Sequence, residues 1–158
     1  MPDRRPLIAG NWKMWGTRAQ AKPYCEKLLE LIPAEGERPA DVGLCVPFTA
    51  LDLVVSLLDG SGVLVAAQDM HQDEAGAYTG HISAPMLTEL GVDAVVLGHS
   101  ERRAEAGETD SALQDKVPAA LAAGLVPILC VGETEAEREE GSTQRKLRHQ
   151  VQEDLERV

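Results

Sequence analysis

The chain has 158 residues, of which 44% are hydrophobic and 3% are aromatic, so we expect a single domain over residues 1–158 with an aliphatic core. A formal net charge of −11 argues against nucleic acid and anionic membranes as partners. No apolar run is long enough to span a membrane, and the apolar stretch near the N-terminus is too short for a signal peptide. The three scattered cysteines form no disulfide or zinc pattern, which favours the cytoplasm.

The first half of the chain alternates short apolar runs with helical patterns. We expect strands at residues 7–10, 42–46 and 64–67, each followed by a helix. The caps predicted for these helices are Thr17, Thr49 and Ser83. Pro23 is unfavourable inside the first helix, which therefore begins near Lys22 or is kinked. Its predicted buried face contains residues at helical spacing, namely Ala21, Tyr24, Leu28 and Leu31 or Ile32.

The second half continues the same alternation. Strands are expected at residues 94–97 and 126–131, with a helix from Thr109 or Asp110 to Leu121 between them. A charged segment at residues 135–140 precedes a last amphipathic helix, whose predicted apolar face is Leu147, Val151, Leu155 and Val158. Five strand–helix repeats predict a parallel sheet with polar residues gathered at one edge. No strand is followed by a glycine-rich nucleotide-binding loop.

Two polar clusters follow predicted strands directly. Asn11–Trp12–Lys13 comes after the first strand, and the segment 99–103 (His-Ser-Glu-Arg-Arg) comes after the fourth. Ligands of parallel α/β proteins bind at the carboxyl ends of the strands. A lone histidine is more often a hydrogen-bonded loop residue, but two dense clusters in equivalent places favour a functional site. The loop at residues 71–80 is long enough to suggest a functional or interface role.

Several segments resemble the triosephosphate isomerase family, in the family's order and with similar spacing. They are residues 9–14 (AGNWKM), 47–49 (PFT), 67–69 (AQD), 76–80 (GAYTG), 98–103 (GHSERR), 107–109 (GET) and 127–133 (PILCVGE). The resemblance implies an α/β fold, a truncated (β/α)8 TIM-barrel-like domain with five parallel βα units. It also implies interconversion of glyceraldehyde 3-phosphate and dihydroxyacetone phosphate by proton transfer, a step of glycolysis and gluconeogenesis that uses no metal or cofactor.

The resemblance also assigns roles to residues. His99, Lys13 and Glu101 would be catalytic: His99 as a neutral hydrogen-bond donor to the substrate carbonyl, Lys13 as the cation, and Glu101 as a buried carboxylate near Lys13. Asn11 and Lys13 would bind a phosphorylated triose. The resemblance implies two further pairs: Tyr78 and Thr79 at a homodimer interface, and Arg102 with Glu108 as a structural ion pair.

Three βα units of the family barrel have no counterpart in the sequence. They carry the catalytic glutamate, which acts as general base, and the loops that hold the phosphate. We therefore expect impaired isomerase activity. Glu133 lies at the end of the fifth strand, where a substitute base would be needed, but the resemblance places it elsewhere in the family's site. The alternatives are a non-catalytic, self-associating remnant and one half of a two-chain barrel. Open sheet edges and an uncovered apolar face predict a homo-oligomer.

Overall fold

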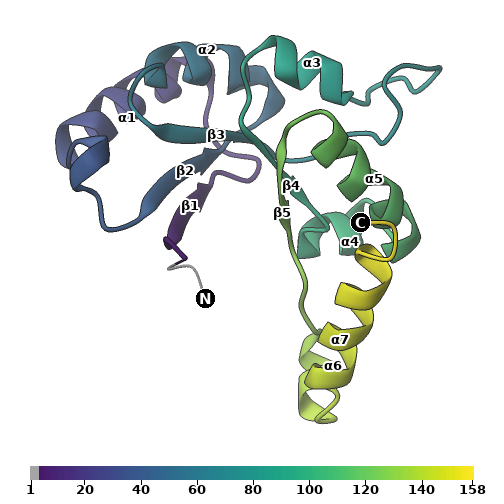
Figure 1. Ribbon diagram of the computed structural model, residues 1–158. Helices are drawn as coiled ribbons and strands as arrows, with labels where there is room; N and C mark the ends of the chain where they lie inside the picture. Colours follow the sequence, from purple (N-terminus) through teal and green to yellow (C-terminus); the bar gives the residue numbers. More distant parts are fainter. Residues whose placement is uncertain (1–3) are drawn as a thin grey trace. The chain divides into compact units, whose positions relative to one another are not determined.

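Five strands in sequential order, β1-β2-β3-β4-β5, form the sheet of this chain in the computed structural model (Figure 1), which describes residues 4–158. The strands are β1 (Leu7–Asn11), β2 (Asp41–Cys45), β3 (Val63–Ala67), β4 (Ala94–Leu97) and β5 (Val126–Leu129). The registers of β1 with β2, β2 with β3 and β3 with β4 are parallel. The five predicted strands are confirmed, with bounds that differ by no more than two residues.

The chain is divided into two compact units. The first contains residues 4–68 and 86–95, and the second contains residues 69–85 and 96–158. The first half of β4 belongs to the first unit and its second half to the second. The prediction of a single domain over residues 1–158 stays a prediction.

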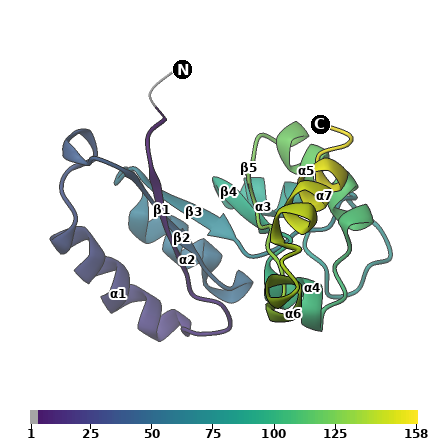
Figure 2. The ribbon, with the colours of Figure 1, turned by 90° about the horizontal axis from the view of Figure 1, so that it is seen from below.

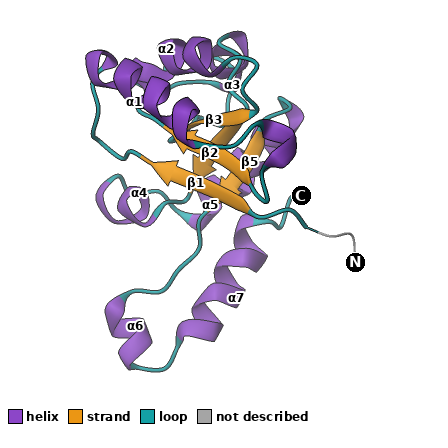
Figure 3. Cartoon of the chain, turned by 90° about the vertical axis from the view of Figure 1, so that its left-hand side faces the viewer, coloured by secondary structure: helices purple, strands orange, loops and turns teal. Residues whose placement is uncertain are grey.

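Helices α1 (Arg18–Leu31) and α2 (Phe48–Leu58) lie on one side of β1–β3 in the first unit (Figures 1 and 3). Thr17 caps α1 in a capping box, in which its N–H donates to Gln20 Oε1 at 2.9 Å. The helix begins at Arg18 and continues through Pro23, so the first of the two predicted alternatives, a start near Lys22, is wrong. The favourable cap fixes the first turn upstream of the proline.

The buried face of α1 and the N-cap of α2 differ from the predicted ones. Ala21 and Cys25 are buried in α1, whereas Tyr24 is 47% exposed and packs edge-on against Trp12. In α2 the N-cap is Pro47 rather than Thr49. Proline has a fixed φ that suits a helix entry, and Thr49 falls inside the first turn. A short 3-10 helix, η1 (Glu35–Glu37), connects the α1 region to β2, and α3 (Ala84–Glu89) follows the predicted cap Ser83.

The second unit contains α4 (Ser100–Glu105), α5 (Asp110–Ala122), α6 (Glu135–Glu139) and α7 (Thr143–Asp154). Helix α5 packs against both β5 and α7, and α6 and α7 lie side by side after β5 (Figures 2 and 3). Of the two residues expected at the start of α5, Thr109 is the cap, since its hydroxyl accepts a hydrogen bond from Ala112 N–H at 3.1 Å. The sequence pattern does not predict helix α4, because five of its six residues are polar and the one alanine gives no apolar period.

The buried side of α7 is polar, which corrects the predicted apolar face. Gln150 and Asp154 are buried, while Val151 and Leu155 are 42% and 39% exposed. Gln150 Oε1 accepts the Gly132 N–H at 2.8 Å, and Asp154 accepts from the Arg103 guanidinium. Hydrogen bonds to groups far away in the sequence therefore orient this helix, and a hydrophobic period cannot reveal them.

The middle strands β3 and β4 are buried, and the edge strand β1 is exposed. Residues of β3 and β4 such as Val65, Val95 and Leu97 are buried, but β1 is exposed along its whole length, with Ile8 at 65%. An exposed edge strand carries backbone groups that can pair with another chain. Over residues 4–158, none of the helices combines the length and the apolar character needed to cross a membrane.

Candidate active site

The turn after β1 is held by side-chain hydrogen bonds within the first unit. Lys13 has a φ of 51°, the one positive value at a non-glycine residue among residues 4–158. Asn11 Oδ1 accepts the Lys13 N–H at 2.8 Å. Gln68 Nε2 donates to the Lys13 carbonyl at 2.9 Å and to Asn11 Oδ1 and the Cys45 carbonyl at 3.2 Å each. Unfavourable backbone conformations persist where surrounding contacts enforce them, often at functional sites.

The sequence places Gln68 in the AQD motif but assigns it no role. In the structure its side-chain amide donates hydrogen bonds that hold the turn after β1. We expect Gln68→Glu to lower the free energy of unfolding by about 1–3 kcal/mol, because a carboxylate cannot donate to the three acceptors that face it. Urea denaturation measures the effect. Gln20→Glu is the matched control and is expected to be neutral, since Gln20 Oε1 accepts hydrogen bonds from Thr17. Equal stability of the two variants would contradict the role given to Gln68.

In the second unit, the His99 ring is held by a backbone hydrogen bond at the start of α4. His99 is the N-cap of the helix, and its Nδ1 accepts the Glu101 N–H at 3.2 Å. A neutral imidazole whose Nδ1 accepts a hydrogen bond carries its proton on Nε2. Nε2–H can therefore donate to a carbonyl oxygen. The Glu101 side chain is 52% exposed, whereas the resemblance implies a buried carboxylate. Burial is not needed here, because backbone N–H groups stabilise an acidic side chain in the first turn of a helix.

A cavity of about 460 Å³ lies beside His99, with Arg103, Cys130, Glu133 and Lys146 among its lining residues. Burial raises the pKa of the Cys130 thiol. A hydrogen bond from the backbone N–H of Glu133 and the ion pair with Arg138 hold the pKa of the Glu133 carboxyl below its usual range. A carboxylate stabilised in this way is a weak proton acceptor, which argues against Glu133 as the substitute base.

A buried charge network connects the loop after β3 to the segment before His99. Lys116 forms ion pairs with Asp69, at 2.7 Å, and with Glu108, and all three side chains are less than 10% exposed. Arg102 Nη2 lies 2.6 Å from Asp69, and its Nε lies 3.9 Å from Glu108. The Glu108–Arg102 ion pair is confirmed as part of this larger network. Glu108 Oε2 also accepts the Gly98 N–H at 3.0 Å.

A second network surrounds Arg103. Its Nε donates to the Gly98 carbonyl at 2.7 Å, and its Nη2 donates to the Cys130 carbonyl at 3.1 Å. The same guanidinium pairs with Asp110 and, at 2.8 Å, with Asp154. Four acceptor groups from separate parts of the second unit are thus held by one planar cation, the geometry for which arginine is suited.

Burial raises the pKa of the Asp154 carboxyl from its ordinary value of 3.8 to about 6, although the Arg103 hydrogen bond opposes this shift. Between about pH 4 and 6 the folded state then binds more protons than the unfolded state, so the stability contributed by residue 154 falls as pH rises. On going from pH 7 to 4.5, we expect wild type to gain roughly 1–3 kcal/mol relative to Asp154→Asn. Urea denaturation of both proteins at the two pH values measures this, and a constant difference would contradict it.

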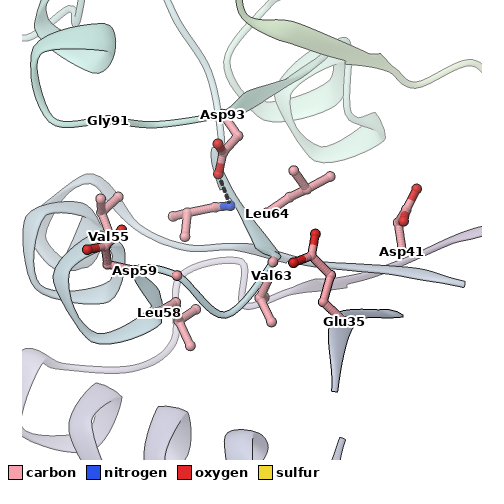
Figure 4. A pocket seen from close by; sticks show the side chains of 12 residues that line it. Glu35, Asp41, Val55, Leu58, Asp59, Val63, Leu64, Gly91 and Asp93 are labelled. Carbon is pink, nitrogen blue, oxygen red and sulfur yellow. Dashed lines mark hydrogen bonds between the residues drawn. The ribbon is translucent and has the colours of Figure 1, made fainter. Parts of the chain in front are cut away.

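A different cavity, of about 350 Å³, lies near the start of β3 in the first unit (Figure 4). Its lining contains the carboxylates of Glu35, Asp41, Asp59 and Asp93 and no basic side chain. Asp93 Oδ2 accepts the Val65 N–H at 2.8 Å, shown by the dashed line in Figure 4. Like charges repel, so this cavity does not suit a phosphorylated substrate. Within residues 4–158, no group of three or more His, Cys, Asp or Glu residues is arranged to hold a metal ion.

The family model for triosephosphate isomerase matches residues 6–158. The chain belongs to the triosephosphate isomerase family. A protein of Trichormus variabilis named triosephosphate isomerase is 49% identical to this chain over 154 residues. One of Moorella thermoacetica with the same name is 47% identical over 152 residues. Each match covers 96% of this chain. The crystal structure of triosephosphate isomerase from Bartonella henselae superposes with a TM-score of 0.86 at 40% identity.

The chain spans about three fifths of the triosephosphate isomerases that it matches: 63% and 60% of the two relatives and 62% of the crystal structure. This share agrees with five βα units of an eight-unit barrel. The α/β, truncated TIM-barrel-like fold expected from the sequence is confirmed.

The predicted site residues follow strand ends in both units. Asn11 and Lys13 belong to the first unit, where Gln68 joins them, and His99 and Glu101 belong to the second. Of the two predicted interface residues, Tyr78 donates to Asp73 and stacks on His71 with ring centroids 4.0 Å apart, while Thr79 is exposed. The catalytic, binding and interface roles of these residues stay predictions.

Proposed function

We propose that this chain supplies the cation and the hydrogen-bond donor for the interconversion of glyceraldehyde 3-phosphate and dihydroxyacetone phosphate. Membership of the family supports the reaction. The observation that carries the proposal is the hydrogen bond from the Glu101 N–H to His99 Nδ1, which leaves Nε2–H as a donor when the ring is neutral. Lys13 and Asn11, in a turn fixed by Gln68, would bind a phosphorylated triose.

Isomerisation of a triose phosphate requires a hydrogen-bond donor and a cation near the substrate carbonyl. Removing a proton from the carbon next to the carbonyl moves negative charge onto the carbonyl oxygen. His99 Nε2–H would donate to that oxygen, and the Lys13 ammonium would balance the charge of the enediolate and the phosphate; fixed donors and cations stabilise such charge strongly in a dry site. The general base would come from outside residues 4–158, because Glu133 is held by Arg138. We therefore propose that the chain alone isomerises triose phosphates poorly.

A chimera tests this proposal. The part of the Trichormus variabilis protein that this chain does not match is joined after residue 158, and isomerase activity is measured in a coupled assay for the chain and the chimera. We expect a folded, active chimera and a chain with much lower activity. His99→Gln in the chimera should lower kcat by about 100-fold or more, and Lys13→Met should lower kcat/KM by a similar factor.

Lys22→Met is the matched control, because Lys22 is exposed on α1 and pairs with Glu26 on the same helix. Its activity should equal that of the unmodified chimera. A chimera that folds but does not isomerise triose phosphates, or that is indifferent to His99→Gln, would contradict the proposal. Activity restored by adding the missing part as a separate chain would favour the two-chain barrel.

A second proposal, self-association, is favoured by the exposed edges of the sheet. Ile8 in β1 is 65% exposed and Val126 in β5 is 53% exposed. We propose a homo-oligomer that covers these strands, with Tyr78 and Thr79 of the long loop in the interface. Sedimentation velocity at micromolar concentration should show a dimer or larger species, and Ile8→Lys should shift it toward monomer. A compact monomer would contradict this proposal.

We also propose a cytoplasmic location. The three cysteines form no disulfide with one another, which is the usual state of thiols in a reducing compartment.

A further inference from the structure

The two peptide units that flank Gly98 are held by side chains of opposite charge. The Gly98 N–H donates to Glu108 Oε2 at 3.0 Å, and the Gly98 carbonyl accepts from Arg103 Nε at 2.7 Å. Because a peptide unit is planar, the Gly98 carbonyl and the His99 N–H move together. A group that fixes this carbonyl therefore fixes the backbone from which the His99 side chain projects.

Arg103 is in turn fixed from three directions. Asp110 in α5 and Asp154 in α7 accept hydrogen bonds from its guanidinium, and Nη2 also donates to the Cys130 carbonyl after β5. The Asp154 side chain is fully buried. It lies 51 residues from Arg103 in the sequence, so the contact exists only when α7 is docked within the second unit.

We infer that Arg103 and Asp154 are positioning residues for His99, so that docking of α7 sets the direction in which His99 presents Nε2–H. This inference rests on the function proposed above. The guanidinium joins α7, α5 and the end of β5 to the one carbonyl that precedes His99. A displacement of about 1 Å at a reacting group can lower a rate by about 100-fold. A small movement of His99 away from this position would therefore lower the rate of isomerisation.

The hydrogen bonds around residue 103 require the shape of a guanidinium as well as its positive charge. Nε and Nη2 reach the Gly98 and Cys130 carbonyls while Nη1 and Nη2 reach the two carboxylates. A lysine ammonium keeps the charge but is a single point, and it cannot span these acceptors. Arg103→Lys therefore keeps the positive charge but loses hydrogen bonds that hold the backbone before His99. Asp154→Asn removes the negative charge that α7 presents to Arg103, with little change in side-chain shape.

The first experiment follows the histidine ring resonances of the 158-residue chain by NMR, with His99 assigned from His99→Gln. In Arg103→Lys and in Asp154→Asn we expect the His99 ring signals to shift or to split into two, while those of His71 and His81 stay in place and report an intact fold. Asp115→Asn is the matched control, because it breaks an exposed ion pair between α5 and Arg157. Unchanged His99 signals in both folded variants would overturn the inference.

The second experiment measures kinetics of the same variants in the chimera. We expect kcat to fall about 10- to 100-fold in Arg103→Lys and Asp154→Asn with KM within about twofold, and Asp115→Asn to match the unmodified chimera. A loss in KM alone, or an equal loss in Asp115→Asn, would overturn the positioning role. If the unmodified chimera were inactive, the proposed function would fail, while the NMR comparison would still decide whether Arg103 and Asp154 orient His99.

Discussion

Replacing Lys116 by methionine is expected to lower the free energy of unfolding by about 3–5 kcal/mol, because removing one partner of a buried ion pair leaves uncompensated charge. The Lys116 ammonium lies between Asp69 and Glu108, whose side chains are 8% and 2% exposed. Without it, Arg102 alone faces both carboxylates. Burial raises the pKa of Asp69, in line with the low exposure of its side chain. Urea denaturation at pH 7 measures the loss.

Two further variants make this test specific. Lys27→Met breaks the exposed pair with Glu30 on α1 and should change stability by no more than about 0.5 kcal/mol. The double variant Lys116→Met/Glu108→Gln should be more stable than Lys116→Met alone, because one buried charge has been removed with its partner. A Lys116→Met protein within about 1 kcal/mol of wild type would show that the network contributes little.

Gly98→Ala is the second substitution for which a large effect is expected. Gly98 has a φ of +71°, and a Cβ there would lie 2.8 Å from Arg103 Nη2, 2.9 Å from Leu113 Cδ1 and 3.0 Å from the Cys130 carbonyl oxygen. The positive φ and the overpacking together should destabilise the fold by about 2–4 kcal/mol. The displaced guanidinium should also disturb the His99 resonances.

Gly124→Ala separates the two causes. Gly124 has a φ of +80°, but a Cβ added there would meet no atom within 4 Å, so the variant should lose only the conformational contribution of about 1 kcal/mol. The difference between the two variants isolates the crowding at Gly98. Equal losses in urea denaturation would mean that Arg103 and Leu113 move aside freely.

The strands and the family could be predicted because they depend on local patterns. Continuous apolar runs such as residues 94–97 mark buried strands whatever the rest of the chain does. The motifs around Asn11 and His99 are likewise short and contiguous. Helix caps were less predictable: Thr17 and Thr109 cap as expected, whereas Pro47 caps α2 in place of Thr49.

The contacts that support the site could not be predicted, because they join residues far apart in the sequence. Gln68 reaches Asn11 across 57 residues, and Asp154 reaches Arg103 across 51. The second of these contacts buries a polar face of α7 and leaves its apolar residues Val151 and Leu155 partly exposed, opposite to the prediction from periodicity. A polar side chain is buried when a specific partner satisfies it, and sequence spacing contains no sign of that partner.

The most direct test of the proposed function is an NMR titration of the 158-residue chain with dihydroxyacetone phosphate. The backbone amide of Lys13 and the ring of His99 should shift with one and the same concentration dependence, and Lys13→Met should abolish the shift at His99. A His99 response that persists unchanged without the Lys13 ammonium, or no response at either residue, would contradict the account.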